Sequence, residues 1–181
     1  MQPEHISQLK NIVGAENIIS NTDNLRVYEC DAFVAAKRRP EVVVLPTSTE
    51  QVAQVVRFAA DNEIPVVPRG AGSGLAGGIM AESDCIVIGS SRLNRILEID
   101  LPNQRALVEA GVVNSHLTRA VAAAGYGFAP DPSSQAACTI GGNIANNSGG
   151  PHTLKYGVTV NHTLGVELVL PSGEVVWLGG E

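Results

Sequence analysis

A glycine-rich segment that directly follows an apolar run is the feature that most constrains the fold of this chain. Residues 68–78 read Pro-Arg-Gly-Ala-Gly-Ser-Gly-Leu-Ala-Gly-Gly, and residues 72–77 match the GxGxxG pattern of dinucleotide-binding folds. In those folds the glycines open a crossover helix of about ten or more residues. Here only seven residues separate Gly77 from the next apolar run, which begins at Cys85. This spacing excludes a Rossmann site, and the lack of Lys-Ser or Lys-Thr after the last glycine excludes a Walker A loop.

Glycine lacks a Cβ atom, so successive backbone N–H groups of such a segment can point at one anion. The alternative is a tight turn that binds nothing. However, five glycines among these eleven residues lose much conformational entropy on folding, and a plain turn would not offset that loss. We therefore predict an anion-binding loop, with phosphate oxygens as the expected ligand.

The elements around this loop predict a βαβ unit. Residues 42–45 and 64–68 read as buried strands, and apolar residues recur at helical spacing between them. Two strands joined by one helix run parallel, with a right-handed crossover. The helix has two candidate capping boxes at its start, Ser48 with Gln51 and Thr47 with Glu50.

Shorter patterns complete a chain of the α+β class. A helix over about residues 4–13 is expected to end near Gly14. We predict an N-terminal helix and extended lead-in over residues 1–40, and the main domain over residues 41–181. The remaining expected elements are strands at 85–88, 95–99 and 106–110, a helix from about Asn114 to Gly125, and a hairpin of 164–170 with 174–178.

Composition and charge exclude several classes of function. Twelve lysines and arginines against 18 acidic residues give a net charge of −6, and aromatic residues make up 4%, so neither a basic nucleic-acid surface nor base-stacking platforms are expected. No apolar run reaches the about 20 residues that cross a bilayer, and no signal-peptide pattern is present. Three scattered cysteines fit a reducing compartment, and the histidines lack metal-ligand spacing. We expect a cytoplasmic protein with no metal, no nucleic-acid partner and no transmembrane segment, while peripheral attachment through a protein partner stays open.

Residues 130–150 form a second segment, rich in glycine, serine, asparagine and proline. Gly141 and Gly142 permit close approach to a flat or charged ligand. Taken alone, the segment could equally be a polar surface loop, but two such segments in one small domain favour a large cofactor with phosphates and polar rings. Three asparagines recur near helical spacing, as in a short helix that faces a polar ligand: Asn143, Asn146 and Asn147.

Together the two segments resemble the FAD-binding domain of the flavoprotein family that includes vanillyl-alcohol oxidase and p-cresol methylhydroxylase. The resemblance rests on PRGAGSGLAGG and on DPSSQAACTIGGNIANNSGGPHTLKYGVTVNHTLGVELVLPSGEV, and it extends from about Tyr28 to the last residue. The branch of the family most like this chain contains the D subunit of bacterial glycolate oxidase and flavin-linked D-lactate dehydrogenases. The resemblance implies a small βαβ-containing subdomain followed by a second α+β subdomain, truncated at its C-terminal end.

The resemblance also implies which residues contact FAD. Backbone amides of the first loop would wrap the pyrophosphate, and this group is Arg69, Gly70, Ala71, Gly72, Ser73, Gly74, Leu75, Gly77 and Gly78. A second group would lie near the flavin end, and consists of Asp131, Pro132, Ser133 and Ser134. A third group would lie against the flavin and ribityl region, and consists of Thr139, Gly141, Gly142, Asn143, Asn146 and Gly149, followed by Tyr156 and Gly157. Some relatives tether the flavin through a histidine in the first loop; residues 68–78 contain none, so FAD is expected to be non-covalent.

By the same resemblance, the parent protein is a flavin-dependent 2-hydroxy-acid oxidoreductase of the glycolate or D-lactate type. It would transfer a hydride from the alcohol carbon to flavin N5 and bind a small 2-hydroxy acid as its substrate. In relatives the groups that hold this substrate lie beyond the region that matches this chain. We therefore expect a portion of a longer protein, with no catalytic residues and no turnover of its own. Iron–sulfur or flavin subunits are its expected partners, and they would hold it at the inner face of a membrane.

Two alternative functions, and the role of one histidine, stay open at this point. The chain could belong to a non-catalytic flavin-binding or assembly subunit, or it could be a phosphate- or nucleotide-binding module that uses the same loops without flavin. At His152, a contact with the flavin competes with a purely structural, hydrogen-bonded role.

Overall fold

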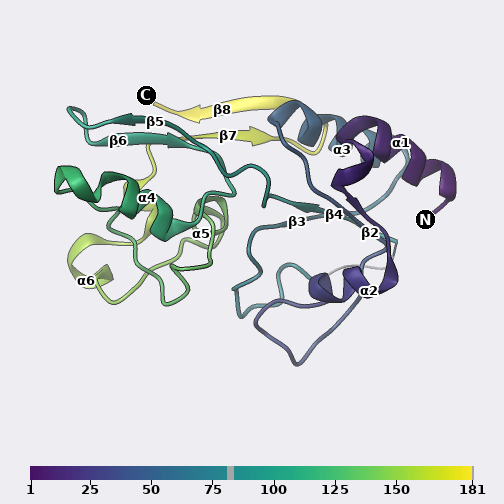
Figure 1. Ribbon diagram of the computed structural model, residues 1–181, viewed down its shortest axis with the longest axis horizontal. Helices are drawn as coiled ribbons and strands as arrows, with labels where there is room; N and C mark the ends of the chain where they lie inside the picture. The colour runs from purple at the N-terminus through teal and green to yellow at the C-terminus, as the bar shows by residue number, and fades with distance from the viewer. Residues whose placement is uncertain (81–83, 181) are drawn as a thin grey trace. The chain divides into compact units, whose positions relative to one another are not determined.

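The computed structural model describes residues 1–80 and 84–180 as two compact units (Figure 1). The first unit consists of residues 1–92 and 165–180, and the second of residues 93–164. The predicted division into 1–40 and 41–181 does not coincide with this grouping, because residues 1–40 lie within the first unit; as a domain boundary it stays a prediction, and its end point, Glu181, lies outside the described residues.

A four-stranded sheet forms the centre of the first unit, in the order β1-β2-β4-β3. Strand β4 runs parallel to both β2 and β3, and β1 runs antiparallel to β2. The predicted βαβ unit is therefore present, but β4 lies between its two strands. The elements of this sheet and its crossover are β1 (Ile18–Ile19), β2 (Val42–Val44), α3 (Thr49–Asp61), β3 (Val66–Arg69) and β4 (Ile86–Gly89).

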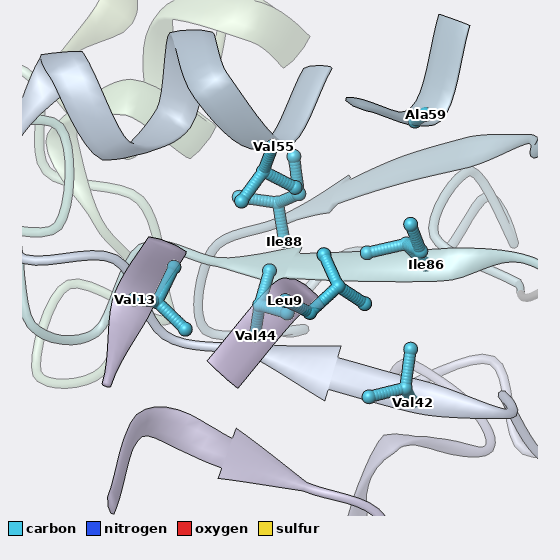
Figure 2. Packing of buried hydrophobic residues seen from close by; sticks show 8 residues of the cluster. All are labelled: Leu9, Val13, Val42, Val44, Val55, Ala59, Ile86 and Ile88. Atoms are coloured by element: carbon cyan, nitrogen blue, oxygen red, sulfur yellow. The ribbon is translucent and has the colours of Figure 1, made fainter. Parts of the chain in front are cut away.

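Both faces of this sheet are buried, which explains why its strands read as continuous apolar runs. Side chains at alternate positions of β2 and β4 pack against α1 (Pro3–Val13) and α3, with Leu9 and Val55 fully buried between helices and sheet (Figure 2). The intervening residues of the same strands, Val43 and Val87, face a second cluster. That cluster includes residues from the short elements α2 (Thr22–Leu25) and η2 (Arg26–Tyr28), and a further short turn, η1 (Ala15–Asn17), precedes β1.

Helix α3 begins at the predicted Ser48 N-cap. The Ser48 hydroxyl accepts a hydrogen bond from the Gln51 N–H at 3.3 Å. The Gln51 side chain does not return to the Ser48 N–H, as a capping box requires, but accepts the Thr47 N–H at 2.8 Å. The first half of the predicted capping box is thus present, and the second half is shifted by one residue.

The predicted C-terminal hairpin is confirmed as β7 (Gly165–Val169) and β8 (Val175–Gly179), which pair antiparallel. It contacts α3 through side chains at both ends of that helix. Thr49 Oγ1 donates to Glu167 Oε1 at 2.5 Å, and Arg57 Nε donates to the Gly173 carbonyl oxygen at 3.3 Å.

The second unit joins a hairpin to several short helices around a small core of Val112, Leu117 and Ile140. In the hairpin the register shifts between Ile96 and Glu98, which marks a bulge. The strand predicted at 106–110 begins one residue earlier and is shorter. No helix in the part of the chain that the structure describes combines the length and the apolar character needed to span a membrane. The elements of this unit are β5 (Ile96–Asp100), β6 (Arg105–Val108), α4 (Asn114–Val121), η3 (Ala122–Ala124), α5 (Ile140–Asn146), α6 (Thr153–Tyr156) and η4 (Thr159–His162).

Candidate functional site

The glycine loop after β3, defined here as residues 70–78, has two backbone positions that require glycine. Gly72 has φ of +74° and Gly77 has φ of +70°, a left-handed conformation that costs other residues about 1 kcal/mol or more. The other glycines differ: a Cβ added at Gly74 would meet its nearest neighbour, Asp31 Oδ2, at 3.9 Å, and one added at Gly78 would meet nothing within 4 Å. Gly74 and Gly78 therefore have room for a side chain within the protein itself.

Backbone N–H groups of this loop lack acceptors over most of its length. Within residues 1–80 and 84–180, no N–H from Gly70 to Ala76 donates a hydrogen bond, whereas the Gly77 N–H does. The loop follows the carboxyl end of a strand in a parallel arrangement, which is where open α/β sheets bind ligands. A run of available N–H donors at this position suits a polyanion such as a diphosphate.

Arg69, at the end of β3, uses its guanidinium inside the protein. Its side chain is buried, and it donates to the Cys30 carbonyl oxygen at 2.9 Å and to the Val27 carbonyl oxygen at 3.2 Å. The guanidinium carbon also lies 5.3 Å from the centre of the Tyr28 ring. Burial lowers the pKa of Arg69 from its ordinary value. The contact of Arg69 with a cofactor stays a prediction, whereas the structure shows its guanidinium joining β3 to the backbone of residues 27 and 30.

One residue that contacts the loop has no signal in the sequence. The carboxylate of Asp31 accepts the Gly77 N–H at 2.9 Å and the Phe33 N–H at 2.8 Å. It lies in a stretch, residues 17–40, that has little hydrophobic periodicity and no recognisable motif. A contact over this sequence separation can be found only from the structure.

In the second unit, α5 begins at Thr139, whose hydroxyl accepts the Gly142 N–H at 3.2 Å. Gly141, in the first turn, packs against the chain at Ala110 and donates its N–H to the Ala110 carbonyl oxygen at 2.8 Å. An added Cβ at Gly141 would lie 2.8 Å from Ala110 Cβ and 2.9 Å from its carbonyl oxygen. Close packing of backbone segments, rather than room for a ligand, requires glycine here.

The side chain of Asn143 is turned toward the interior of its unit, and its predicted contact with FAD stays a prediction. Its side chain is 2% exposed, and its Nδ2 donates to Asn114 Oδ1 at 3.0 Å. Asn114 is fully buried and donates in turn to the Pro130 carbonyl oxygen at 3.0 Å. By contrast, Asn146 and Asn147 are exposed: the Asn146 side chain donates to Gly142 within its own helix, and Asn147 ends that helix with φ of +49°.

Asp131 is engaged with His152. Its Oδ2 lies 2.5 Å from His152 Nδ1, and the hydrogen bond from His152 lowers the pKa of Asp131. A Cβ at Gly150 would overlap the backbone of Asp131, so glycine allows the two segments to meet. His152 thus has the hydrogen-bonded role that was one of its two predicted alternatives.

The remaining predicted residues are mostly in turns. Pro132 and Ser134 accept backbone hydrogen bonds from residues 135–138, and Ser133 is exposed. Gly149 packs against Thr153, whose Oγ1 would lie 2.7 Å from an added Cβ, and Gly157 has φ of +84°. The Tyr156 ring is 45% exposed and lies 4.8 Å from Lys155 Nζ. No group of three or more potential metal ligands gathers among the residues whose positions are described.

Sequence similarity to known proteins identifies the family of this chain. The family described as "FAD binding domain" matches residues 40–179. The glycolate oxidase subunit GlcD of Escherichia coli is 41% identical over 173 residues, covering 96% of this chain and 35% of the relative. The D-lactate dehydrogenase of Anaerostipes hadrus is 37% identical over 177 residues, covering 98% of this chain and 37% of the relative. The chain therefore spans about a third of the length of these relatives.

The fold is also found among solved structures. p-Cresol methylhydroxylase with substrate bound superposes with a TM-score of 0.79 over 96% of this chain and 34% of its own length, at 21% sequence identity. At that identity the similarity shows the fold alone, and it confirms the predicted p-cresol methylhydroxylase type. The family match over most of the chain and the two relatives establish more than the fold: the chain belongs to the FAD binding domain family of flavoproteins.

Proposed function

We propose that the chain is the FAD-binding portion of a flavin-dependent 2-hydroxy-acid oxidoreductase of the glycolate or D-lactate type. Its relatives include a glycolate oxidase subunit and a D-lactate dehydrogenase. Glycolate and D-lactate are both 2-hydroxy acids. Bound FAD supplies the acceptor for the hydride of the alcohol carbon, and the protein supplies binding and orientation. Residues that handle the hydroxy acid are assigned to the part of the whole protein that this chain does not span.

The observation that carries the proposal is the run of backbone N–H groups from Gly70 to Ala76 that find no acceptor among the residues described. We assign the FAD pyrophosphate to this run, since a diphosphate offers several charged oxygens to consecutive N–H donors. Main-chain donors carry this contact, because Arg69 already donates to two carbonyl oxygens of the protein.

The second segment contributes mainly shape to the proposed cofactor site. Asp131, Thr139 and Asn143 are occupied by partners within the protein, so they fix the conformation of the segment. Ser133 and Asn146 are exposed and are the polar side chains that we assign to direct contact with FAD. Because residues 68–78 contain no histidine, FAD is held without a covalent bond at that loop.

The relatives also suggest that the whole protein assembles with other subunits. The relative in Escherichia coli is a subunit of an oxidase, and we propose that the whole protein likewise joins partner subunits that carry iron–sulfur clusters or flavin. We also propose the cytoplasm as its compartment, since its three cysteines are free thiols, as is usual in a reducing environment. The partner subunits would hold it at the inner face of a membrane.

The test is a titration of the 181-residue chain with FAD, in which binding is measured by flavin fluorescence or by calorimetry. We expect weak but saturable binding, because the chain covers about a third of the relatives and leaves part of a long ligand in water. Gly74→Val should weaken binding by about tenfold or more, since a branched side chain would shield the neighbouring N–H groups from the phosphates. Gly180→Val, which follows β8 in the same unit and also has room for a Cβ atom, is the matched control and should change the affinity by less than about twofold.

Equal losses in the two variants, or no binding of FAD by the wild type, would overturn the assignment of the loop. Glycolate and D-lactate should give no turnover with the chain alone and a dye acceptor. Turnover would place the substrate groups within these 181 residues and contradict the proposal.

A further inference from the structure

Asp31 is a buried carboxylate that joins the glycine loop to a segment far away in the sequence. It is 7% exposed, and its Oδ2 accepts the N–H of Gly77, a residue 46 positions later in the chain. Its Oδ1 accepts the Phe33 N–H. Burying a carboxylate is costly unless its oxygens are hydrogen-bonded, and N–H bonds to a charged acceptor are among the strong ones. Both oxygens of Asp31 meet this condition through the backbone.

Residues 27–33, called the strap below, are fastened to the loop region at both ends. At one end the Arg69 side chain donates to carbonyl oxygens of the strap. At the other end Asp31 accepts the Gly77 N–H, and the Ala32 N–H donates to the Gly74 carbonyl oxygen at 3.0 Å. The loop is therefore held at Gly74 and Gly77, immediately beside the N–H groups that have no acceptor.

Such fastening matters because the loop is rich in glycine. A free segment of this composition samples many conformations, and a ligand that orders it loses affinity by the free energy of ordering. Contacts that fix the loop beforehand remove this loss. Asp31 is not itself a ligand for a diphosphate, because like charges repel and each of its oxygens already accepts an N–H.

We propose that Asp31 is a positioning residue that holds the glycine loop in its diphosphate-binding conformation before FAD binds, with Arg69 fastening the opposite end of the strap. The inference rests on the proposed contact between this loop and the FAD pyrophosphate. It assigns a role to a residue that no motif in the sequence marks.

The variant Asp31→Asn tests this role, because it keeps the size of the side chain but replaces one acceptor oxygen with an NH₂ group. We expect the Kd for FAD, and for ADP as a smaller diphosphate probe, to rise about tenfold. In the ligand-free chain, hydrogen exchange of the Gly77 amide, which donates to Asp31, should accelerate by a similar factor. Asp23→Asn removes an exposed carboxylate on α2 and should leave the affinities and the exchange rates within about twofold.

A second variant separates positioning from general loss of stability. Val55→Ala creates a cavity in the core of the same unit and should lower Tm at least as much as Asp31→Asn, yet leave FAD affinity unchanged well below Tm. The wild type adds a readout that needs no variant: the Gly77 amide should exchange slowly without ligand, like the amides of the sheet.

The outcomes distinguish the inference from the function on which it rests. If the wild type binds neither FAD nor ADP, the proposed function fails. If it binds both, but Asp31→Asn changes neither the affinities nor the exchange rate of the Gly77 amide, or Val55→Ala weakens FAD binding equally, the positioning role is overturned. Fast exchange of the Gly77 amide in the wild type would overturn it as well.

Discussion

The two glycine-rich segments of this chain use glycine in opposite ways. In the loop after β3, Gly74 and Gly78 have space around them, and the N–H groups from Gly70 to Ala76 have no acceptor among the residues described. In the second segment, neither Gly141 nor Gly150 has room for a side chain. The backbone of Ala110 lies against Gly141, and the backbone of Asp131 lies against Gly150. The first segment leaves main-chain N–H groups without a partner among the residues described, and the second uses glycine for close packing within its own unit.

The polar side chains follow the same division. Asn143 and Thr139 satisfy other groups of the second unit, and Asp131 holds His152. A count of glycines and asparagines does not separate the two cases. What separates them is whether each N–H, carboxylate and amide already has a partner within the protein.

Among the variants that test this comparison, the largest loss of stability is expected at Asn143. Replacement by Ala leaves Asn114 Oδ1 buried without its donor, which costs about 1–3 kcal/mol, and it also removes packed side-chain atoms. We expect the free energy of unfolding of the second unit to fall by about 2–3 kcal/mol in urea titrations. The exposed Asn146→Ala, in the same helix, should stay within about 0.5 kcal/mol of the wild type. Similar losses in both would mean that Asn143 has no special role in the interior.

A smaller loss is expected for Gly141→Ala. The new Cβ would lie 2.8 Å from Ala110 Cβ and 2.9 Å from a backbone oxygen, an overlap that costs about 1–3 kcal/mol. Helix propensity favours alanine by about 1 kcal/mol, so the net destabilisation should be about 1 kcal/mol. Gly127→Ala in the same unit gives an ordinary contact of 3.7 Å with Thr118 and should be close to neutral in thermal unfolding. A stabilised Gly141→Ala would show that the close packing at Ala110 is not needed.

Local elements of this fold could be predicted because their signals lie close together in the sequence. The Ser48 cap of α3, the end of the helical stretch of α4 and η3 at Gly125, and the hairpin of β7 and β8 were each expected from neighbouring residues and are present. The rejection of a Rossmann site was correct for the same reason, since no crossover helix follows Gly77 within the described residues.

Relations across long sequence distances could not be predicted in this way. Nothing local indicates that β4 lies between β2 and β3, because strand order depends on which apolar faces pack together. Nor does periodicity reveal that the Asn143 side chain donates to Asn114, 29 residues earlier. The contact between Asp31 and Gly77 belongs to the same class.

The smallest effect concerns Asp131 and its pH dependence. Its hydrogen bond with His152 lowers the pKa of Asp131 in the folded chain. A carboxyl group whose pKa is lowered by folding stabilises the fold above its unfolded pKa of about 3.9, and this contribution disappears as the pH falls through the folded pKa. Asp131→Asn should therefore have a slightly lower Tm than the wild type at pH 7, and the difference should shrink as the pH falls below about 4. A constant Tm difference from pH 7 to about pH 3 would mean that the shape of Asp131, and not its charge, holds His152 and the turn at Gly150 in place.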